Sequence, residues 1–186
     1  MRKVLVSLML VAFSVLLYAQ ETPKEPESQS KSVEFLSKNG SFILKEFYDL
    51  GKVKGVTCQV LIMTNIKDNT KMGCLRLETT YSSSYSTDSY IGTLDVDELD
   101  ACIQSLEYIS NNLLPSTPAV YTEAEYKTRD RVRLGAFYNE RKSSWSAFVY
   151  TTYSSRSCEF LDSSSITSLI SVMERAKSLI KEKTSK

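Results

Sequence analysis

The sequence TTYSSS, at Thr79–Ser84, recurs as TTYSSR at Thr151–Arg156, and this near-repeat is the main indication of how the chain folds. Each stretch is followed by a Leu-Asp pair that opens a helical pattern, Leu94-Asp95 in the first case and Leu161-Asp162 in the second. The two stretches begin 72 positions apart and the two Leu-Asp pairs 67 apart, so the first copy has five extra residues in a loop rich in Ser and Tyr. Self-similarity at a fixed offset indicates an internal duplication.

The duplication extends upstream of the repeated loop. VLIMTN at Val60–Asn65 corresponds to LGAFYN at Leu134–Asn139, and a charged turn and another strand-like run follow each. Enrichment in Val, Ile, Thr and aromatic residues between polar turns predicts strands. Each unit, about 40–112 and 119–183, therefore reads as four strands and a helix. The expected strands are 42–50, 56–66, 73–81 and 90–94 in the first unit, and 121–128, 131–138, 145–153 and 157–161 in the second.

The helix of each unit has a capping signal and an apolar stripe. Asp95 and Glu98 form a D-x-x-E capping pattern, and Asp162 or Ser163 can cap the second helix. Because a sheet needs its apolar face covered, we predict an α+β fold of two duplicated units, with two antiparallel four-stranded sheets and two amphipathic helices in a shared core. The stripes are Leu99, Cys102, Ile103, Leu106 and Ile109 in the first helix, and Ile166, Leu169, Ile170, Met173, Ala176 and Ile180 in the second.

The order of the two four-strand-plus-helix units resembles that of Whirly-type single-stranded-DNA-binding proteins. This resemblance is one of topology, since no signature residues are shared, so it implies a fold and transfers no function. The chain is also similar to an uncharacterised group of small secreted proteins of Gram-negative bacteria. That second resemblance implies no particular role.

The N-terminus predicts an exported protein. Arg2 and Lys3 precede an apolar run from Val4 to Leu17, which ends near the small residue Ala19. These features are typical of a cleavable signal peptide, and the run is shorter than the about 20 residues that span a bilayer. The expected organisation is a signal peptide at 1–19, a disordered linker at 20–32 and a single α+β domain at 33–186. We expect a periplasmic or extracellular location, with no integral membrane segment after cleavage.

The composition excludes several classes of site. There is no histidine among the 186 residues, which rules out Ser-His-Asp and Cys-His nucleophile systems and His-based metal sites. No phosphate-binding glycine motif is present either. We therefore expect no catalytic residues, no cofactor and no metal. A formal net charge of +1 disfavours nucleic acid as a partner, because such binding depends on neutralising phosphates.

Four cysteines, Cys58, Cys74, Cys102 and Cys158, lie inside apolar segments. An oxidising compartment permits two disulfides, but cysteine is also readily buried as a free thiol, so both states stay open. No two of them stand at C-x-x-C spacing, which disfavours metal binding.

Lys127, Arg129, Arg131 and Arg133 alternate along the chain. In an extended strand this spacing places four cations on one face, where they could contact an acidic polysaccharide, a phosphate-bearing ligand or an acidic protein patch. The alternative is a solvated strand face that protects a sheet edge with charge.

Tyrosines border the repeated loops. Exposed Tyr and Ser are typical of adaptable contact surfaces, and packing within strands is the alternative role. We expect the enlarged loop 82–89 to be the place where the two copies differ in use. The tyrosines are Tyr81, Tyr85 and Tyr90 beside the first loop, and Tyr150 and Tyr153, with Trp145, in the matching region.

The densest acidic cluster is Asp95, Asp97, Glu98 and Asp100. Such carboxylates could bind Ca²⁺ or supply the acid pair of a hydrolase. Acids in the first turn of a helix also cap free N–H groups and complement the helix dipole, and the pattern favours this structural role.

These patterns predict a secreted or periplasmic, non-enzymatic binding module for an unknown protein or glycan partner at the cell envelope. The alternatives are a Whirly-like single-stranded nucleic-acid-binding protein and a carboxylate-dependent hydrolase. The candidate contact residues are Lys127, Arg129, Arg131, Arg133, Tyr81, Tyr85, Tyr90 and Tyr153.

Overall fold

The computed structural model describes residues 29–185, so the expected signal peptide at 1–19 and residues 20–28 of the expected linker lie outside the described range. The described chain forms two antiparallel four-stranded sheets, in the order β1-β2-β3-β4 (the first sheet) and β5-β6-β7-β8 (the second sheet). The strands are β1 (Ile43–Val53), β2 (Val56–Asn65), β3 (Lys71–Ser82), β4 (Thr87–Asp95), β5 (Glu123–Lys127), β6 (Arg133–Asn139), β7 (Ser144–Tyr150) and β8 (Cys158–Leu161).

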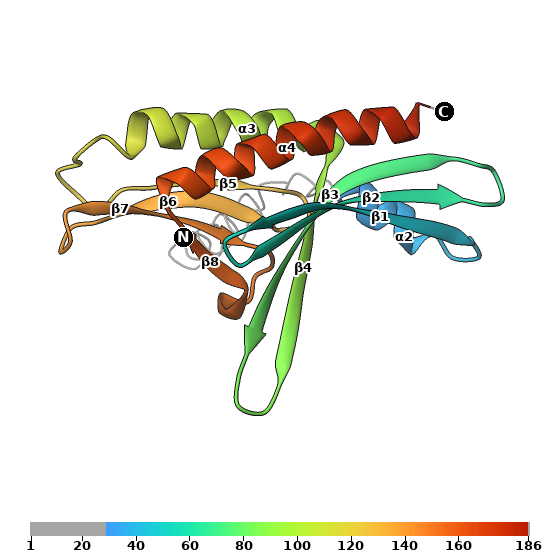
Figure 1. Ribbon diagram of the computed structural model, residues 1–186, viewed down its shortest axis with the longest axis horizontal. Helices are drawn as coiled ribbons and strands as arrows, with labels where there is room; N and C mark the ends of the chain where they lie inside the picture. Colours follow the sequence, from blue (N-terminus) through green and yellow to red (C-terminus); the bar gives the residue numbers. More distant parts are fainter. Residues whose placement is uncertain (1–28, 186) are drawn as a thin grey trace, which may run out of the picture.

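Three α-helices accompany the sheets within residues 29–185: α2 (Lys31–Ser37), α3 (Leu99–Tyr108) and α4 (Ser163–Thr184). The short turn η2 (Val96–Glu98) leads into α3, a π-helical turn η3 (Ile109–Leu113) extends it, and η4 (Ser155–Ser157) precedes β8. Figure 1 shows α3 and α4 side by side, above the two sheets. The arrangement confirms the predicted α+β fold. None of the described helices is both long and apolar enough to cross a membrane.

The two long helices close one core that both sheets share. α4 contacts β1, β2 and β3 of the first sheet as well as β8, and α3 contacts α4 and β6. The predicted stripes of both helices lie in this core, with Ile170 partly buried and the other stripe residues buried. The helix of each unit thus reaches the sheet of the other unit, so neither unit covers its own apolar face alone.

The repeated threonines meet where the two units join. The Oγ1 atoms of Thr79 and Thr151 are 2.8 Å apart, and both residues are buried. Thr151 Oγ1 also donates to the carbonyl oxygen of Tyr90 at 3.0 Å, which holds the segment after β7 against β4. Gly92 permits this close approach, because a Cβ atom there would overlap the carbonyl oxygen of Thr151. The two TTYSS stretches therefore occupy corresponding places on either side of one contact.

The first hairpin of each unit reaches the helix cap of the other unit. The turn between β1 and β2 places Lys54 Nζ 2.8 Å from Asp162 Oδ2, and Asp162 is the N-cap of α4. The turn between β5 and β6 places Arg129 Nη2 3.0 Å from Asp95 Oδ2. Glu98 Oε2 accepts a hydrogen bond from Asp95 N at 3.1 Å, which is the predicted capping interaction. The duplication therefore repeats the cross-connection as well as the strands and helices.

The helix α2 lies outside the duplicated pattern. It begins within the expected linker 20–32, where Ser30 and Ser32 are buried. The carboxylate of Asp95 accepts hydrogen bonds from Lys31 N (2.7 Å) and Ser32 N (3.0 Å), so residues 30–32 belong to the folded structure. From there α2 covers the face of the first sheet opposite the shared core, through a buried cluster of Phe35, Leu61, Met63 and Cys74.

The expected loop 82–89 is mostly regular. β3 continues to Ser82 and β4 begins at Thr87, because the cross-strand pairs run on through Tyr81 and Asp88. Threonine and tyrosine suit extended strands, so a segment read as an irregular loop continues the ladder instead. Figure 1 shows this hairpin projecting from the body of the molecule as a long arm. We call residues 80–90 the hydroxyl hairpin, since ten of these eleven residues carry a hydroxyl group.

The four cysteines are free thiols. Cys58, Cys74 and Cys102 are fully buried, and burial raises the pKa of each to about 12. The buried thiols are therefore protonated at neutral pH, which makes them weak nucleophiles.

Candidate functional site

The second sheet has one face in the shared core and one face turned away from it. Leu134, Ala136 and Val149 belong to the core. Because side chains alternate along a strand, the residues between them point to the opposite face. The described helices that contact this sheet, α3 and α4, lie on its core side (Figure 1). The outward side chains of the two central strands are Arg133 and Phe137 on β6, and Ser146, Phe148 and Tyr150 on β7.

Aromatic rings form a continuous cluster across this outward face. The ring of Phe137 lies 6.3 Å from that of Phe148 and 6.4 Å from that of Phe160, and Phe148 lies 5.4 Å from Tyr150. Gly135 makes room for the cluster, because a Cβ atom there would come within 2.8 Å of the Phe148 ring. Phe160 on β8 is 59% exposed, so the cluster reaches solvent at that side.

Cations lie over the tyrosines at the other side of the same face. Lys127 Nζ is 5.4 Å and Arg131 Cζ is 4.9 Å from the centre of the Tyr153 ring, which is 54% exposed. Arg133 Cζ is 4.2 Å from the Tyr150 ring, and Arg133 also pairs with Glu125 at 3.1 Å. We call this surface the aromatic–cationic face, made of Phe137, Phe148, Tyr150, Tyr153, Phe160, Lys127, Arg131 and Arg133.

The prediction of one extended strand with four aligned cations is wrong. β5 ends at Lys127 and β6 begins at Arg133, with a turn between them in which Arg131 has a φ of +70°. The physical reason lies in Asp130, whose carboxylate accepts hydrogen bonds from N (2.8 Å) and Oγ1 (2.7 Å) of Thr93. That contact ties the turn to β4 and sends Arg129 away from the other three cations. Lys127, Arg131 and Arg133 still meet at the tyrosines, and Arg129 does not.

Arg129 completes the acidic cluster at the start of α3. Its guanidinium group pairs with Asp95, with Asp97 and, at 3.4 Å, with Glu98. Its backbone N also donates to Glu98 Oε1 at 2.8 Å. The hydrogen bond from Arg129 lowers the pKa of Asp97 to about 2. Asp100, the fourth member of the cluster, pairs with Lys177.

Each carboxylate of this cluster is therefore engaged in a helix cap or an ion pair. Within residues 29–185, no group of three His, Cys, Asp or Glu side chains is arranged to hold a metal ion. The geometry of the cluster favours the structural role, because Arg129, Lys177 and the helix cap engage these carboxylates.

Two groups at the aromatic–cationic face, the Tyr150 phenol and the neighbouring Cys158 thiol, are held in their neutral forms. A hydrogen bond with Cys158 and burial raise the pKa of the Tyr150 phenol. Burial raises the pKa of the Cys158 thiol in turn. Both groups are therefore protonated at neutral pH, so the face offers hydrogen-bond donors and ring surfaces rather than a nucleophile.

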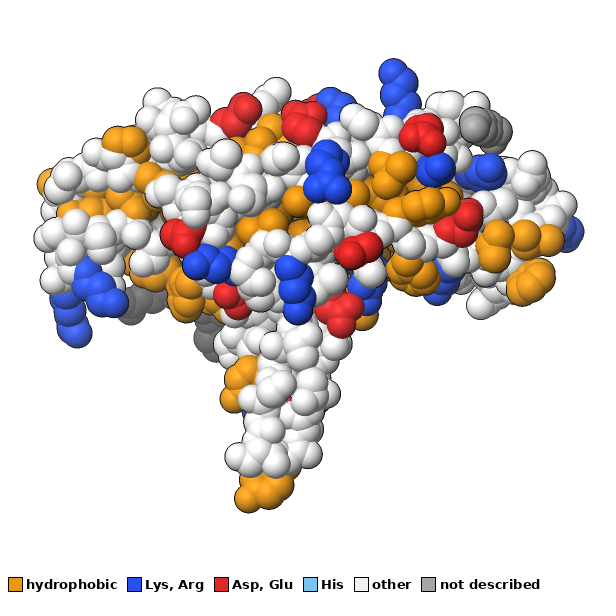
Figure 2. Space-filling view, viewed as in Figure 1, with side chains coloured by type: hydrophobic (Ala, Val, Ile, Leu, Met, Phe, Trp, Pro, Cys, Tyr) orange, Lys and Arg blue, Asp and Glu red, His pale blue; other side chains and the backbone are white. Residues whose placement is uncertain are grey.

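The other predicted tyrosines lie on the hydroxyl hairpin. Tyr85 is at its tip and is 99% exposed, and Figure 2 shows an apolar tip on an arm almost without charged side chains. Tyr81 lies under the guanidinium of Arg156, 5.1 Å away, and Arg156 is 3.8 Å from Asp88 on the hairpin. Tyr90 is half-buried at the base. Through Arg156, the hydroxyl hairpin therefore contacts the segment after β7, which also contains Tyr153.

The sequence patterns missed Arg156 and the three phenylalanines of the face. Arg156 is the one position at which TTYSSR differs from TTYSSS, so comparison of the copies contained that signal. Phe137 and Phe148 stand at alternating positions beside core residues. That alternation can be recognised in the sequence, but it does not show which side of the sheet the helices cover.

Comparison of the chain with protein-family models, with curated proteins and with solved structures found no match.

Proposed function

We propose that this protein is a secreted or periplasmic, non-enzymatic binding module that holds an acidic glycan on the aromatic–cationic face. The observation that carries the proposal is the exposed ring of Tyr153 flanked by Lys127 and Arg131. An exposed ring offers a flat apolar surface to the C–H face of a sugar, and flanking cations offer charge-assisted hydrogen bonds to its carboxylate or sulfate groups.

The extent of the surface supports a polymer over a single small ligand. Linked rings run from Tyr150 through Phe148 and Phe137 to Phe160 on β7, β6 and β8. Phe148 is buried, whereas Phe160 and Tyr153 are more than half exposed, so these two rings would offer separate stacking positions at which successive sugars bind weakly and add their contributions. The export expected from the N-terminal sequence would place such a module where envelope glycans occur.

The charges on the face favour an acidic glycan over a nucleic acid. A bound strand of nucleic acid has a phosphate at every nucleotide, and its affinity depends on neutralising many of them. The face has three cations, and Glu125 already pairs with Arg133. A few cations beside exposed aromatic rings suit a polymer that makes most of its contact through the apolar faces of its sugars.

The chemistry around the face favours binding over catalysis. The phenol of Tyr150 and the thiol of Cys158 have raised pKa values, and neither provides the ionised nucleophile or poised base that a hydrolytic step needs. The carboxylate of Glu125 is paired with Arg133.

Binding to polygalacturonate, a polymer of uronic acids, tests the proposal by isothermal titration calorimetry. Tyr153→Ala and Arg131→Ala are each expected to weaken binding by roughly tenfold. Tyr108→Ala is the matched control, because Tyr108 is 58% exposed and belongs to α3, which lies on the core side of the second sheet, opposite the aromatic–cationic face. Neutral dextran should bind more weakly than polygalacturonate.

Two results would overturn the proposal: no measurable binding to polygalacturonate, or an equal loss in Tyr108→Ala and Tyr153→Ala. Oligo(dT) measured at two salt concentrations separates the nucleic-acid alternative. Tight, salt-sensitive binding that Tyr153→Ala removes would assign the face to single-stranded nucleic acid instead.

A further inference from the structure

β1 is a long edge strand with one side unpaired. The first sheet has the order β1-β2-β3-β4, so no described strand pairs with the second side of β1, which runs for 11 residues. The carbonyl oxygen of Phe42 accepts a hydrogen bond from Ile66 N at 2.9 Å. Because inward and outward backbone groups alternate in an antiparallel pair, the N–H and C=O groups of Ile43, Lys45 and Phe47 point to the free edge.

This edge has some of the features that usually prevent association and lacks others. Natural edge strands are short, or carry proline, bulges or charged side chains. β1 is long and contains no proline; it carries charges such as Lys45 and Asp49, and its bulge, between Asp49 and Gly51, leaves the strand regular from Ile43 to Asp49. Phe47 is 53% exposed and Leu44 is 49% exposed on this strand. A regular, partly apolar edge of this length is suited to pairing with another strand.

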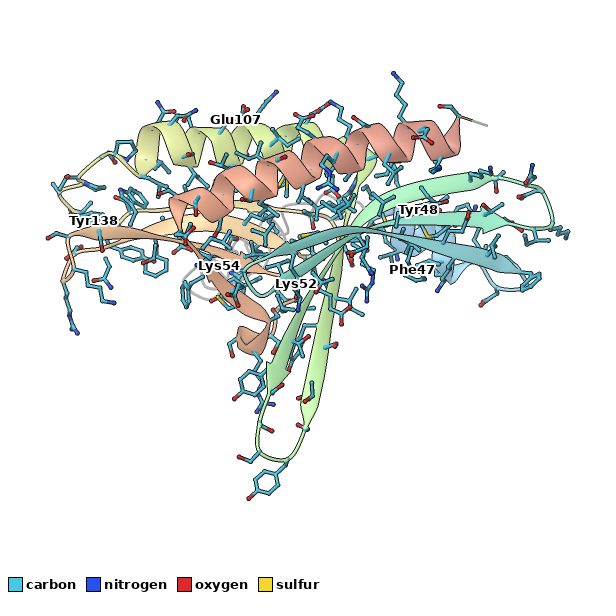
Figure 3. The ribbon with its side chains drawn as sticks, in the orientation of Figure 1. Phe47, Tyr48, Lys52, Lys54, Glu107 and Tyr138 are labelled. Atoms are coloured by element: carbon cyan, nitrogen blue, oxygen red, sulfur yellow. The ribbon has the colours of Figure 1, made fainter. Side chains whose placement is uncertain are left out.

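The side chains of β1 alternate between two faces. Lys45 stands opposite Met63 and Phe47 opposite Leu61 on β2, and both partners lie under α2, so Lys45, Phe47 and Asp49 share the face away from the core. Tyr48 points to the α4 side, where Lys183 lies over its ring. Figure 3 shows Phe47 and Tyr48 on opposite sides of the strand.

We propose that two copies of this protein associate through antiparallel pairing of β1 with β1, about a twofold axis that passes at Phe47. The pairing joins the two first sheets into one continuous sheet. Phe47 then stands opposite Phe47 of the second copy, and Lys45 stands opposite Asp49 of the second copy. Neither charge has an ion-pair partner within residues 29–185 of its own chain, so each gains one on association.

Alternative registers are less favourable. A centre at Lys45 or at Glu46 would place like charges directly opposite each other, which destabilises a strand pair. A centre at Tyr48 would place Phe47 opposite Asp49 and form no ion pair. If the twofold axis passed between two residues instead of at one, backbone groups that point to the free edge would face backbone groups of the second copy that point to its own β2. The hydrogen bonds between the two strands would then be lost.

The α4 side of the strand is compatible with the same register. There, Leu44 stands opposite Leu50 of the second copy, and Glu46 stands opposite Tyr48, whose hydroxyl donates to Glu46 of its own chain at 3.1 Å. A groove of about 750 Å³ lies between β1 and α4, lined among others by Tyr48, Glu174 and Arg175. This groove leaves space beside the two paired β1 strands for the side chains on their α4 side. The second sheet takes no part, so the inference is independent of the proposed glycan binding.

Charge exchange in the exported protein tests the register by sedimentation equilibrium. Lys45→Asp places two acids opposite each other, and Asp49→Lys places two lysines opposite each other, so each is expected to raise the dimer dissociation constant by roughly tenfold. The double variant Lys45→Asp/Asp49→Lys exchanges both partners and should return to within about threefold of the parent. Lys67→Asp, in the turn between β2 and β3, makes the same charge change away from the edge and should have no effect.

Disulfide cross-linking tests the same contact between the two β1 strands without changing the charges. In a Cys158→Ser background, Phe47→Cys should form a disulfide-linked dimer on mild oxidation, because opposed residues in a hydrogen-bonded pair have Cα atoms about 5.5 Å apart. Leu44→Cys is the control, since it is similarly exposed but faces Leu50 of the second copy. A parent that stays monomeric at about 100 µM, a double variant that does not recover, or equal cross-linking at both positions would overturn the proposal.

Discussion

Arg129 links the two units through a buried carboxylate, so its removal tests how tightly the units are connected. The side chain of Arg129 is 20% exposed and that of Asp95 is 3% exposed. Arg129→Met keeps an apolar stem of similar length and removes the guanidinium donors. Asp95 is then left buried without its cation.

The expected loss follows from the partners that remain. Removing one partner of a buried ion pair costs about 3–5 kcal/mol. Asp95 keeps its hydrogen bonds from Lys31 N and Ser32 N, so we expect the lower end, about 3 kcal/mol. At about 2–4 °C for each kcal/mol in a domain of this size, the melting temperature should fall by about 6–12 °C.

The corresponding pair in the other unit provides the control. Lys54 and Asp162 occupy the equivalent connection, but their side chains are 46% and 51% exposed. Exposed ion pairs contribute at most about 1 kcal/mol, so Lys54→Met should change stability little. Urea unfolding at neutral pH, followed by circular dichroism, compares the two variants. Equal losses of stability in Arg129→Met and Lys54→Met would contradict the view that burial makes the Arg129–Asp95 connection the stronger one.

The same variant has an expected pH dependence. Arg129 lowers the pKa of Asp97 to about 2 in the folded protein, compared with about 3.9 in an unfolded chain. A carboxyl group whose pKa falls on folding stabilises the protein above its unfolded pKa, and that stabilisation is lost as the pH falls from about 4 towards 2. Arg129→Met should reduce this acid sensitivity. An unchanged acid profile would show that Asp97 owes its low pKa to other groups.

Three further predictions follow from the core. Gly92→Ala should destabilise the protein by about 1–3 kcal/mol in urea unfolding, because its Cβ would overlap the carbonyl oxygen of Thr151; no loss would mean that the two units meet less closely. Thr79→Val and Thr151→Val should show a coupling of about 1 kcal/mol in a double-mutant cycle, and strict additivity would contradict the contact between them. The three buried thiols should resist alkylation until the protein unfolds, as mass spectrometry can show. Since burial raises their pKa from 9.0 to about 12, stability should fall as the pH rises through that interval.

The duplication made most of the fold predictable. The repeated Leu-Asp pair after each TTYSS stretch placed both helix starts, and Asp95 and Asp162 do lie at the starts of their helices. Helix α2 was not predictable in this way, because it has no counterpart in the second unit. Its first N–H groups bond to Asp95, more than 60 residues away in the chain, and no local pattern reports such a partner.

The candidate site was predictable in part. Tyr153 and three of the four alternating cations do lie together, but through a turn and a sheet face rather than along one strand. The alternation of Lys127 to Arg133 is compatible with a strand, and only the contact of Asp130 with Thr93 on β4 makes the segment turn. Tertiary contacts of this kind override local spacing.

The two copies differ on the faces that point away from the shared core, and this difference supports placing the proposed glycan contact on the second unit. On the first sheet, Arg76 donates to Gln59 and pairs with Glu78, each at 2.7 Å, which satisfies the polar groups within the sheet. α2 covers the part of that face around Leu61, Met63 and Cys74. At the matching positions of the second sheet, the offset of 72 places Phe148 for Arg76 and Tyr150 for Glu78, and the match of Val60–Asn65 with Leu134–Asn139 places Arg133 for Gln59. A closed polar network in one copy corresponds to a cluster of rings with a flanking cation in the other, where the described helices supply no cover. Since both copies must keep the same core residues to share one interior, divergence was open mainly to these outward positions, and a ligand contact gives the apolar ones a role that core packing does not.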